Sequence, residues 1–431
     1  MKKVKIGVLG GYRGTSMINY CKIAGNAQVV AICDKAPDVL EAQKEATKGL
    51  DITFYDNFDD FIKHDMDAVV LANYAHQHAP FAIRAMERGL HVFSEVLPTQ
   101  TLKEAVELIE AVERTGMVYA YGENYCYMPA TYEMKRLYRE GKVGEVEYAE
   151  GEYIHNGESI WHSITYGERD HWRNRMYSTF YCTHSAGPII HITGLRPVSV
   201  TGFEGTGTHR RERVGAKCGG YGIEMVTLEN GAVLRSVHGA LYTGGNWYSL
   251  YGSKGMMENA RRATGSGNVK KLYLRYDDKD GDYDLKEEAY LPAREFDEKA
   301  KAFGHGNSDF YSMWHFCEKI LGNPDADIID VYEALDMSLI GIFAYRSILQ
   351  GGIPVTIPDL RNKEERERWK NDVLCTDPDV AGDSLLPTRR GGTPDIPDEV
   401  YERMKQKWDA ERNDKSEDNY RNAALKQGSA K

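Results

Sequence analysis

Tyr181 and His184 stand three residues apart in the stretch FYCTHSAGPIIHITG, which runs from Phe180 to Gly194. A phenol and an imidazole can both release and take up protons, so this pair could serve acid–base chemistry. The Ser-Ala-Gly-Pro run after it opens an apolar segment of helical character. Core packing at a helix start explains the same pattern, so the pair alone leaves both interpretations open.

Elements that could position such a pair follow from the hydrophobic patterns. Short apolar runs (VKIGVLG, AQVVAICD, DAVVLAN, HVFSEV, VYAYGEN) alternate with helical patterns (PFAIRAMERGL, LKEAVELIEAVERTG) over the first 120 residues. This alternation predicts an α/β fold with a doubly wound parallel Rossmann sheet over residues 1–122. Aromatic-rich alternating stretches then predict an α+β domain with an open, mainly antiparallel sheet over 123–358. The charged, Pro/Gly-punctuated segment 359–431 predicts a peripheral extension, partly helical, with a disordered end at KQGSAK.

Composition excludes several classes of protein. The 431 residues suffice for two domains, and the net charge of −11 argues against nucleic acid or an anionic membrane as the main partner. Seven cysteines without a CxxC pair favour a reduced, cytoplasmic chain. MKKVKIGVLGG enters a strand at once, which leaves no room for a signal peptide, and no apolar run is long enough to span a membrane. The His and Cys residues show no metal-ligand spacing, so we expect no metal.

The segment GVLGGYRG follows the first predicted strand and precedes a helix. Gly10, Gly11 and Gly14 would let a pyrophosphate approach the backbone at a helix N-terminus, although the loop is one residue shorter than a strict GxGxxG. Asp34 ends the second strand, 24 residues after Gly10. A carboxylate there can accept hydrogen bonds from ribose hydroxyls and repels a 2′-phosphate, which favours NAD over NADP. A strand-end turn is the alternative role for Asp34.

The layout resembles the glucose–fructose oxidoreductase / inositol dehydrogenase / MocA family over about residues 1–360. The matching segments are GVLGGYRG, ANYAHQHAP and HVFSEVLP. Dehydrogenases of this family carry Glu-Lys-Pro after the HVF strand, and their lysine assists proton transfer beside the nicotinamide. Val96 stands where that lysine is expected. The resemblance implies cofactor contacts from Gly10, Gly11, Tyr12, Arg13, Gly14, Asp34, Asn73, His78, Glu95 and Asn124.

Glycoside hydrolase family 109, the NAD-dependent α-N-acetylgalactosaminidases, also lacks the lysine. It has segments similar to ENYCY (123–127), EGEYIH (150–155), YCTHSAGP (181–188) and GHGNSDF (304–310), in the same order. SAGP replaces the more usual Gly-Leu-Gly-Pro, and GNSD replaces Gly-Gly-x-Asp. The resemblance implies that Glu123, Tyr153, Tyr181 and His184 form the active site.

That resemblance implies glycoside cleavage that begins when NAD oxidises carbon 3 of the sugar. A base then removes the proton on carbon 2, and the aglycone leaves by elimination. Finally, water adds to the double bond and the hydride returns to carbon 3. His184 would take the hydroxyl proton, one of the two tyrosines would act at carbon 2, and Glu123 would bind or orient. The identity of the glycoside, neutral or acidic, stays open. A sugar dehydrogenase that releases NADH is one alternative, and a catalytically decayed NAD-binding regulatory protein is another.

Other side chains could contact the sugar, and each has a structural alternative. Trp172 and Arg173 could form a stacking platform and an anion contact, or a charged loop; neighbouring Arg169 and Arg175 could bind an acidic group. His191 is expected to be a core histidine. His305 and Asp309 lie on a Gly-rich turn, where a helix cap explains the pattern nearly as well. The set expected to bind substrate is His155, Trp172, Arg173, Tyr127 and His305. A homodimer or homotetramer is the expected assembly, because members of the family associate through the open sheet face.

Overall fold

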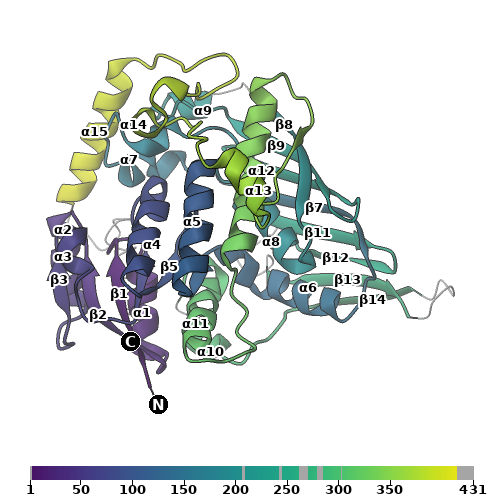
Figure 1. Ribbon diagram of the computed structural model, residues 1–431, viewed down its shortest axis with the longest axis horizontal. Helices are drawn as coiled ribbons and strands as arrows, with labels where there is room; N and C mark the ends of the chain where they lie inside the picture. Colours follow the sequence, from purple (N-terminus) through teal and green to yellow (C-terminus); the bar gives the residue numbers. More distant parts are fainter. Residues whose placement is uncertain are drawn as a thin grey trace. The chain divides into compact units, whose positions relative to one another are not determined.

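The structure is a computed structural model that describes residues 2–205, 209–241, 245–261, 270–278, 285–301 and 303–414. The chain divides into two compact units (Figure 1). The first contains Met1–Met128 and Arg294–Leu335, and the second contains Pro129–Ala293 and continues from Asp336 to Asp414. These units differ from the predicted segments 1–122, 123–358 and 359–431, because residues 294–335 return to the first unit.

The first unit is built on a six-stranded sheet with the order β3-β2-β1-β4-β5-β6. All of its strand pairs are parallel, which confirms the predicted doubly wound sheet. β1 and β4 are almost entirely buried, as expected for central strands covered on both faces. The strands are β1 (Val4–Leu9), β2 (Ala27–Cys33), β3 (Thr53–Tyr55), β4 (Ala68–Leu71), β5 (His91–Ser94) and β6 (Tyr119–Tyr121).

Helices connect these strands, and the returning segment adds α10 and α11. Within the unit α4 packs against α5, and α1 packs against α11. α5 shows why the sequence pattern was informative: it has a clear apolar face and ends at Gly116, whose φ of 66° is a left-handed C-cap. The helices are α1 (Thr15–Ile23), α2 (Pro37–Ala46), α3 (Phe58–Phe61), η1 (Ala75–Gln77), α4 (His78–Glu87), α5 (Leu102–Thr115), η2 (Asn124–Tyr127), α10 (Asp297–Ala300), η6 (His305–Asn307) and α11 (Ser308–Ile320).

The N-terminus of α5 carries a carboxyl group that makes stability depend on pH. Thr101 Oγ1 accepts a hydrogen bond from the Glu104 amide, and Glu104 Oε2 accepts one from the Gln100 amide at 2.6 Å. Burial nevertheless raises the pKa of Glu104 to about 7. Because the folded state then holds this proton more tightly than the unfolded chain, stability falls as the pH rises from about 4.5 to about 7.

We expect Glu104→Gln to remove about 3 kcal/mol of that fall in the free energy of unfolding, since Gln keeps the shape of the cap without the charge. Urea unfolding of both proteins across pH 4–8 measures the difference. Glu107→Gln is the matched control, because Glu107 lies on the same helix, is half-exposed and pairs with Lys103. Equal pH slopes for the parent and the Glu104 variant would contradict the prediction.

The second unit is built on a nine-stranded sheet with the order β14-β13-β12-β11-β7-β10-β9-β8-β15. Its pairs are antiparallel except β7 with β10, which confirms the predicted mainly antiparallel sheet. The strands are β7 (Val146–Ile154), β8 (Pro197–Gly205), β9 (Tyr221–Leu228), β10 (Val233–Gly239), β11 (Gly245–Gly252), β12 (Gly255–Asn259), β13 (Leu272–Asp277), β14 (Leu285–Tyr290) and β15 (Val355–Thr356).

Helices cover one face of this sheet (Figure 1): α8 packs on β7, β10 and β11, and α6 on β12 and β13. Glycines on that face allow the close approach, since a Cβ at Gly202 would lie 2.2 Å from the Ala344 carbonyl oxygen of α12. The helices are α6 (Pro129–Arg139), η3 (Glu158–Ile160), α7 (Trp161–Ile164), η4 (Trp172–Arg175), α8 (Thr183–Thr193), α9 (His209–Glu212), α12 (Val331–Leu349), α13 (Lys363–Trp369), α14 (Pro378–Ala381), η7 (Gly382–Ser384) and α15 (Asp398–Asn413).

The charged C-terminal segment is not peripheral up to Asp414, which corrects the expectation from its composition. α15 packs on α7 and buries Tyr401, Met404 and Trp408. The Tyr401 hydroxyl donates to the Gly215 carbonyl, so an apolar stripe holds this polar helix on the second unit. The predicted disorder at KQGSAK lies outside the described residues.

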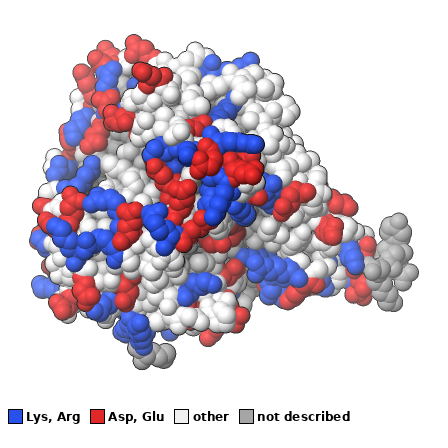
Figure 2. All heavy atoms as spheres, in the orientation of Figure 1, with Lys and Arg blue, Asp and Glu red and all other residues white. Residues whose placement is uncertain are grey.

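Surface charge agrees with the composition. On the face drawn in Figure 2, acidic and basic side chains are interspersed and do not form one broad basic area. Within the part of the chain that the structure describes, no helix is both long and apolar enough to cross a membrane.

Candidate active site

The loop between β1 and α1 leaves room for a ligand because three of its residues have no side chain. Gly10 has φ +94°, and a Cβ there would lie 2.4 Å from the Ala72 carbonyl oxygen. A Cβ at Gly14 would lie 2.4 Å from Val8 Cγ1, and one at Gly11 would lie 2.9 Å from Val39 Cγ1. No side chain caps α1, so its N-terminus can face a phosphate. The loop therefore fits the pyrophosphate of a dinucleotide.

Asp34 lies beside this loop at the end of β2. Its Oδ2 accepts a hydrogen bond from the Gly11 amide at 2.7 Å, and its Oδ1 accepts one from the Ala36 amide at 2.9 Å. Burial raises the pKa of Asp34 even though these amides favour the carboxylate. The carboxylate is thus held at the edge of the loop, where a ribose hydroxyl can donate to it. Its position fits the predicted preference for NAD.

Asn73 and His78 follow β4 and act differently from each other. Both polar atoms of the Asn73 side chain are buried and have no hydrogen-bond partner among the described residues, so a bound molecule could satisfy them. The His78 ring lies 2.9 Å from the Leu97 carbonyl oxygen through Nδ1 and 3.3 Å from that of Asn73 through Nε2. Burial lowers the pKa of His78 to about 4, so the neutral ring holds backbone in place. His78 therefore positions the backbone, and a direct cofactor contact from Asn73 stays a prediction.

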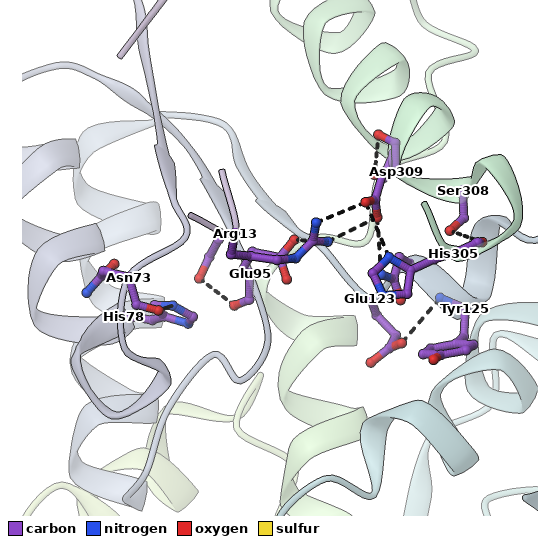
Figure 3. Close-up of polar contacts among 12 residues, drawn as sticks. Arg13, Asn73, His78, Glu95, Glu123, Tyr125, His305, Ser308 and Asp309 are labelled. Atoms are coloured by element: carbon purple, nitrogen blue, oxygen red, sulfur yellow. Dashed lines mark hydrogen bonds and ion pairs between the residues drawn. The ribbon is translucent and has the colours of Figure 1, made fainter. Parts of the chain in front are cut away.

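Arg13 connects the glycine-rich loop with two carboxylates (Figure 3). Its guanidinium lies 2.6 Å from Glu95 Oε1 and donates to both oxygens of Asp309, at 2.9 and 3.0 Å. Burial opposes ionisation of Asp309, but the guanidinium holds the pKa of this carboxyl well below its usual range. Burial raises the pKa of Glu95 despite the same cation. The bidentate pair with Asp309 is therefore the stronger of the two interactions.

Residues 123–127 lie beside this network in the first unit. Glu123 is fully buried and its carboxylate accepts from the Tyr125 amide at 3.3 Å, so it shapes the turn into η2 (Figure 3). Asn124 donates through Nδ2 to Asp309 at 3.1 Å, while its Oδ1 is buried without a hydrogen-bond partner among the described residues. Tyr127 donates its hydroxyl to the Asp327 carbonyl and packs on His315. This geometry supports Asn124 as a cofactor contact but makes Tyr127 a core residue rather than a substrate contact.

The second unit brings together the Tyr and His side chains that the sequence singled out. Tyr153, near the end of β7, lies with its ring centroid 4.6 Å from that of His184 on α8. The Tyr181 ring also stacks on His184: the two ring centroids are 5.7 Å apart and the ring planes are nearly parallel, at 7°. His184 is only 7% exposed. The imidazole thus contacts two phenol rings, an arrangement in which three proton-exchanging groups meet.

A proline fixes the position of His184. Pro188 lies inside α8 and has no N–H, so it cannot donate to the carbonyl four residues earlier, that of His184. The Tyr248 hydroxyl of β11 donates to this carbonyl instead, at 2.6 Å. Gly151 of β7 leaves space for the same turn, because a Cβ there would lie 1.9 Å from the Ser185 carbonyl oxygen. Helix, strand and tyrosine together hold the imidazole.

The cation Arg173 contacts this cluster at Tyr181. It donates through Nη1 to the Tyr181 hydroxyl oxygen at 2.7 Å and so stabilises negative charge on that oxygen. Its guanidinium also covers the ring of Trp172, 4.5 Å away. Trp172 is 7% exposed, so it packs beneath Arg173 and does not present an open platform to a sugar. Exposed His155 stacks on Tyr153, with ring centroids 5.6 Å apart.

Other residues considered from the sequence have structural roles. Arg169 pairs with Asp398 at the surface, and His191 is buried against Lys135 with Nε2 2.7 Å from Nζ. Asp309 does not cap α11, since the N-cap is Asn307 and makes no side-chain cap bond. The roles of Asp309 and Tyr248 were missed; the Gly-rich turn was a signal for the first, and the proline in SAGP for the second. No group of three or more His, Cys, Asp or Glu that could hold a metal ion occurs in the described ranges.

Two family models match parts of the chain. Residues 4–123 match the oxidoreductase family with an NAD-binding Rossmann fold, and residues 249–371 match the C-terminal domain of glycosyl hydrolase 109. The first match confirms the predicted NAD-binding domain. The second begins within β11 and ends after α13, and it includes residues 294–335, which belong to the first unit.

Relatives and solved structures agree with these matches. A glycosyl hydrolase family 109 protein of Shewanella putrefaciens is 27% identical over 402 residues, which cover 83% of this chain and 85% of the relative. A protein of the same description from Phocaeicola vulgatus is 26% identical and covers 83% of each chain. The fold is also that of scyllo-inositol dehydrogenase from Lactobacillus casei with bound NAD(H) and scyllo-inositol, with a TM-score of 0.62, 18% identity and coverage of 83% and 99%.

Proposed function

We propose that this chain, an NAD-dependent enzyme that combines a Gfo/Idh/MocA-type Rossmann domain with a glycosyl hydrolase 109 C-terminal domain, cleaves glycosides and recycles its cofactor. The observation that carries the proposal is the cluster in which His184 contacts both Tyr153 and Tyr181, with Arg173 on the Tyr181 hydroxyl. Val96 replaces the lysine on which dehydrogenases of the family depend. Proton transfer must then come from other groups, and this cluster contains them.

Bound NAD would supply a hydride acceptor for carbon 3 of the sugar and a hydride donor for the return step. Gly10, Gly11 and Gly14 would hold its pyrophosphate, Asp34 a ribose, and Asn73 and Asn124 its remaining polar groups. The oxidised carbon 3 makes the proton on carbon 2 acidic, so a base of modest strength can remove it. The chain must therefore supply one group for the hydroxyl proton and one for the carbon proton.

His184 suits the hydroxyl proton, because an imidazole exchanges protons near neutral pH. Tyr181 suits the carbon proton, because the Arg173 guanidinium stabilises the phenolate that removes it. Tyr153 lies against His184 and would hold the sugar or donate to its oxygens. Departure of the aglycone follows from elimination between carbons 1 and 2, and addition of water then restores the sugar.

Solvent deuterium labelling tests this function most directly. The purified protein is incubated in D₂O with 4-nitrophenyl N-acetyl-α-D-galactosaminide, with and without added NAD, and then with other aryl glycosides. We expect release of nitrophenol together with deuterium at carbon 2 of the free sugar, and no net accumulation of NADH. Cleavage without deuterium at carbon 2 would eliminate this mechanism. Steady NADH formation from a free sugar without bond cleavage would identify a sugar dehydrogenase instead.

A further inference from the structure

The turn η6 ahead of α11 has an unusual backbone. His305, Gly306 and Asn307 have φ values of 52°, 69° and 78°, so three successive residues are left-handed. Only one other non-glycine position among the described residues, Tyr166, has a positive φ. Each left-handed residue other than glycine costs about 1 kcal/mol, so the surrounding contacts must hold this turn. Such strain is concentrated at functional sites.

Asp309 is the group that holds the turn next to the Arg13 network (Figure 3). It is 1% exposed and takes hydrogen bonds from Arg13, at 2.9 and 3.0 Å, and from Asn124, at 3.1 Å. Its Oδ2 also lies 3.3 Å from Nδ1 of His305. Because Arg13 and Asn124 fix the carboxylate, Asp309 in turn fixes which side of the imidazole faces inward. Ser308 closes the turn by donating to the His305 carbonyl at 2.7 Å.

The other side of the imidazole is turned outward. The His305 side chain is 40% exposed, and its Nε2 has no hydrogen-bond partner among the described residues. Tyr125 packs edge-on against the ring, 6.2 Å away, and limits its rotation. An imidazole with Nδ1 held by a buried carboxylate and Nε2 open is the arrangement in which histidine passes protons to a bound molecule.

We propose that His305 is a further proton-transfer group, that it protonates the departing glycosidic oxygen, and that Asp309 is its positioning residue. This inference rests on the proposed glycosidase function. As the bond between carbon 1 and the glycosidic oxygen breaks, its electron pair goes to the oxygen, and the proton on His305 Nε2 moves to that oxygen. When water adds to carbon 1, the same Nε2 takes the proton that the water loses, so His305 returns to its starting state.

The leaving group separates this role from a structural one. A 2,4-dinitrophenyl glycoside needs no proton on its aglycone, whereas a methyl glycoside does. For His305→Gln we expect kcat/KM to fall about 10²-fold or more with the methyl glycoside and less than about fivefold with the dinitrophenyl glycoside. Deuterium exchange at carbon 2 should be unchanged with both. His209→Gln, at an exposed histidine of α9, is the control and should change neither substrate.

Asp309→Asn provides a second variant that keeps the imidazole. Its kcat/KM should show the same dependence on the leaving group, to a smaller extent. NAD affinity is measured in parallel, because Asp309 also holds Arg13. An equal loss on both glycosides, or no loss on either, would overturn the role of His305. A parent enzyme that cleaves neither glycoside would overturn the proposed function itself, and that outcome is visible before any variant is made.

Discussion

His184→Ala should lower glycoside turnover by about 10²–10⁴-fold and leave NAD binding intact. The imidazole contacts the rings of both Tyr153 and Tyr181, with centroids 4.6 and 5.7 Å away. Its loss removes the proposed acceptor of the hydroxyl proton. The glycine-rich loop, Asp34 and Asn73 lie in the other compact unit and keep their own contacts. Turnover is measured with an aryl glycoside, and NAD binding by quenching of protein fluorescence.

Two further variants separate chemistry from folding. His184→Gln fills most of the space of the imidazole, so it should be as inactive as the alanine variant while unfolding near the temperature of the parent. Thr193→Ala, at the other end of α8, removes a hydrogen bond to the Ile189 carbonyl and should stay active. Full activity of His184→Gln would refute the catalytic assignment.

Gly151→Ala should destabilise the second unit by about 3 kcal/mol and reduce turnover by about 10²-fold, although it adds only one methyl group. The new Cβ would lie 1.9 Å from the Ser185 carbonyl oxygen and 2.8 Å from its carbon. Both are backbone atoms, so the start of α8 must move away from β7. His184 precedes Ser185 and moves with it, which separates the imidazole from Tyr153. Urea unfolding and turnover of an aryl glycoside measure the two effects.

Gly245→Ala is the matched control because it changes a glycine in a neighbouring strand of the same sheet. Gly245 pairs with Ile154, and a Cβ there would have nothing within 4 Å. It should therefore cost little stability and keep turnover. Equal behaviour of the two glycine variants would show that α8 does not depend on the close approach at Gly151.

Local patterns predicted much of the fold. The apolar period of LKEAVELIEAVERT matches helix α5, Leu102–Thr115, and Gly116 ends it as a left-handed cap. Helix and strand signals of this kind depend on neighbours within a few residues, so they can be read along the chain. The glycines before α1 and the acidic Asp34 belong to the same class, because a nucleotide-binding turn is a local structure. The boundaries of the units could not be predicted in this way. Residues 294–335 belong to the first unit, although its sheet is built from residues far earlier in the sequence.

The composition of the C-terminal segment predicted a peripheral extension, and this prediction was wrong for α15. Residues 398–413 are charged over most of their surface, and only Tyr401, Met404 and Trp408 form the stripe that packs on the second unit. Three apolar residues in a long polar helix do not show by themselves whether a partner surface exists. The packing of Trp172 is likewise a tertiary feature: its ring is buried and the Arg173 guanidinium covers it, which the sequence did not show.

The sequence by itself determined the two kinds of sheet, the glycine-rich loop with Asp34, and the Tyr181–His184 pair at the start of a helix. Each of these depends on residue types at short spacing. Only the tertiary structure decided that Asp309 pairs with Arg13, 296 residues away, and that Tyr248 takes the carbonyl that Pro188 leaves without a donor. Such partners are chosen when distant segments pack together and each buried polar group must find a hydrogen bond, a condition that no local pattern expresses.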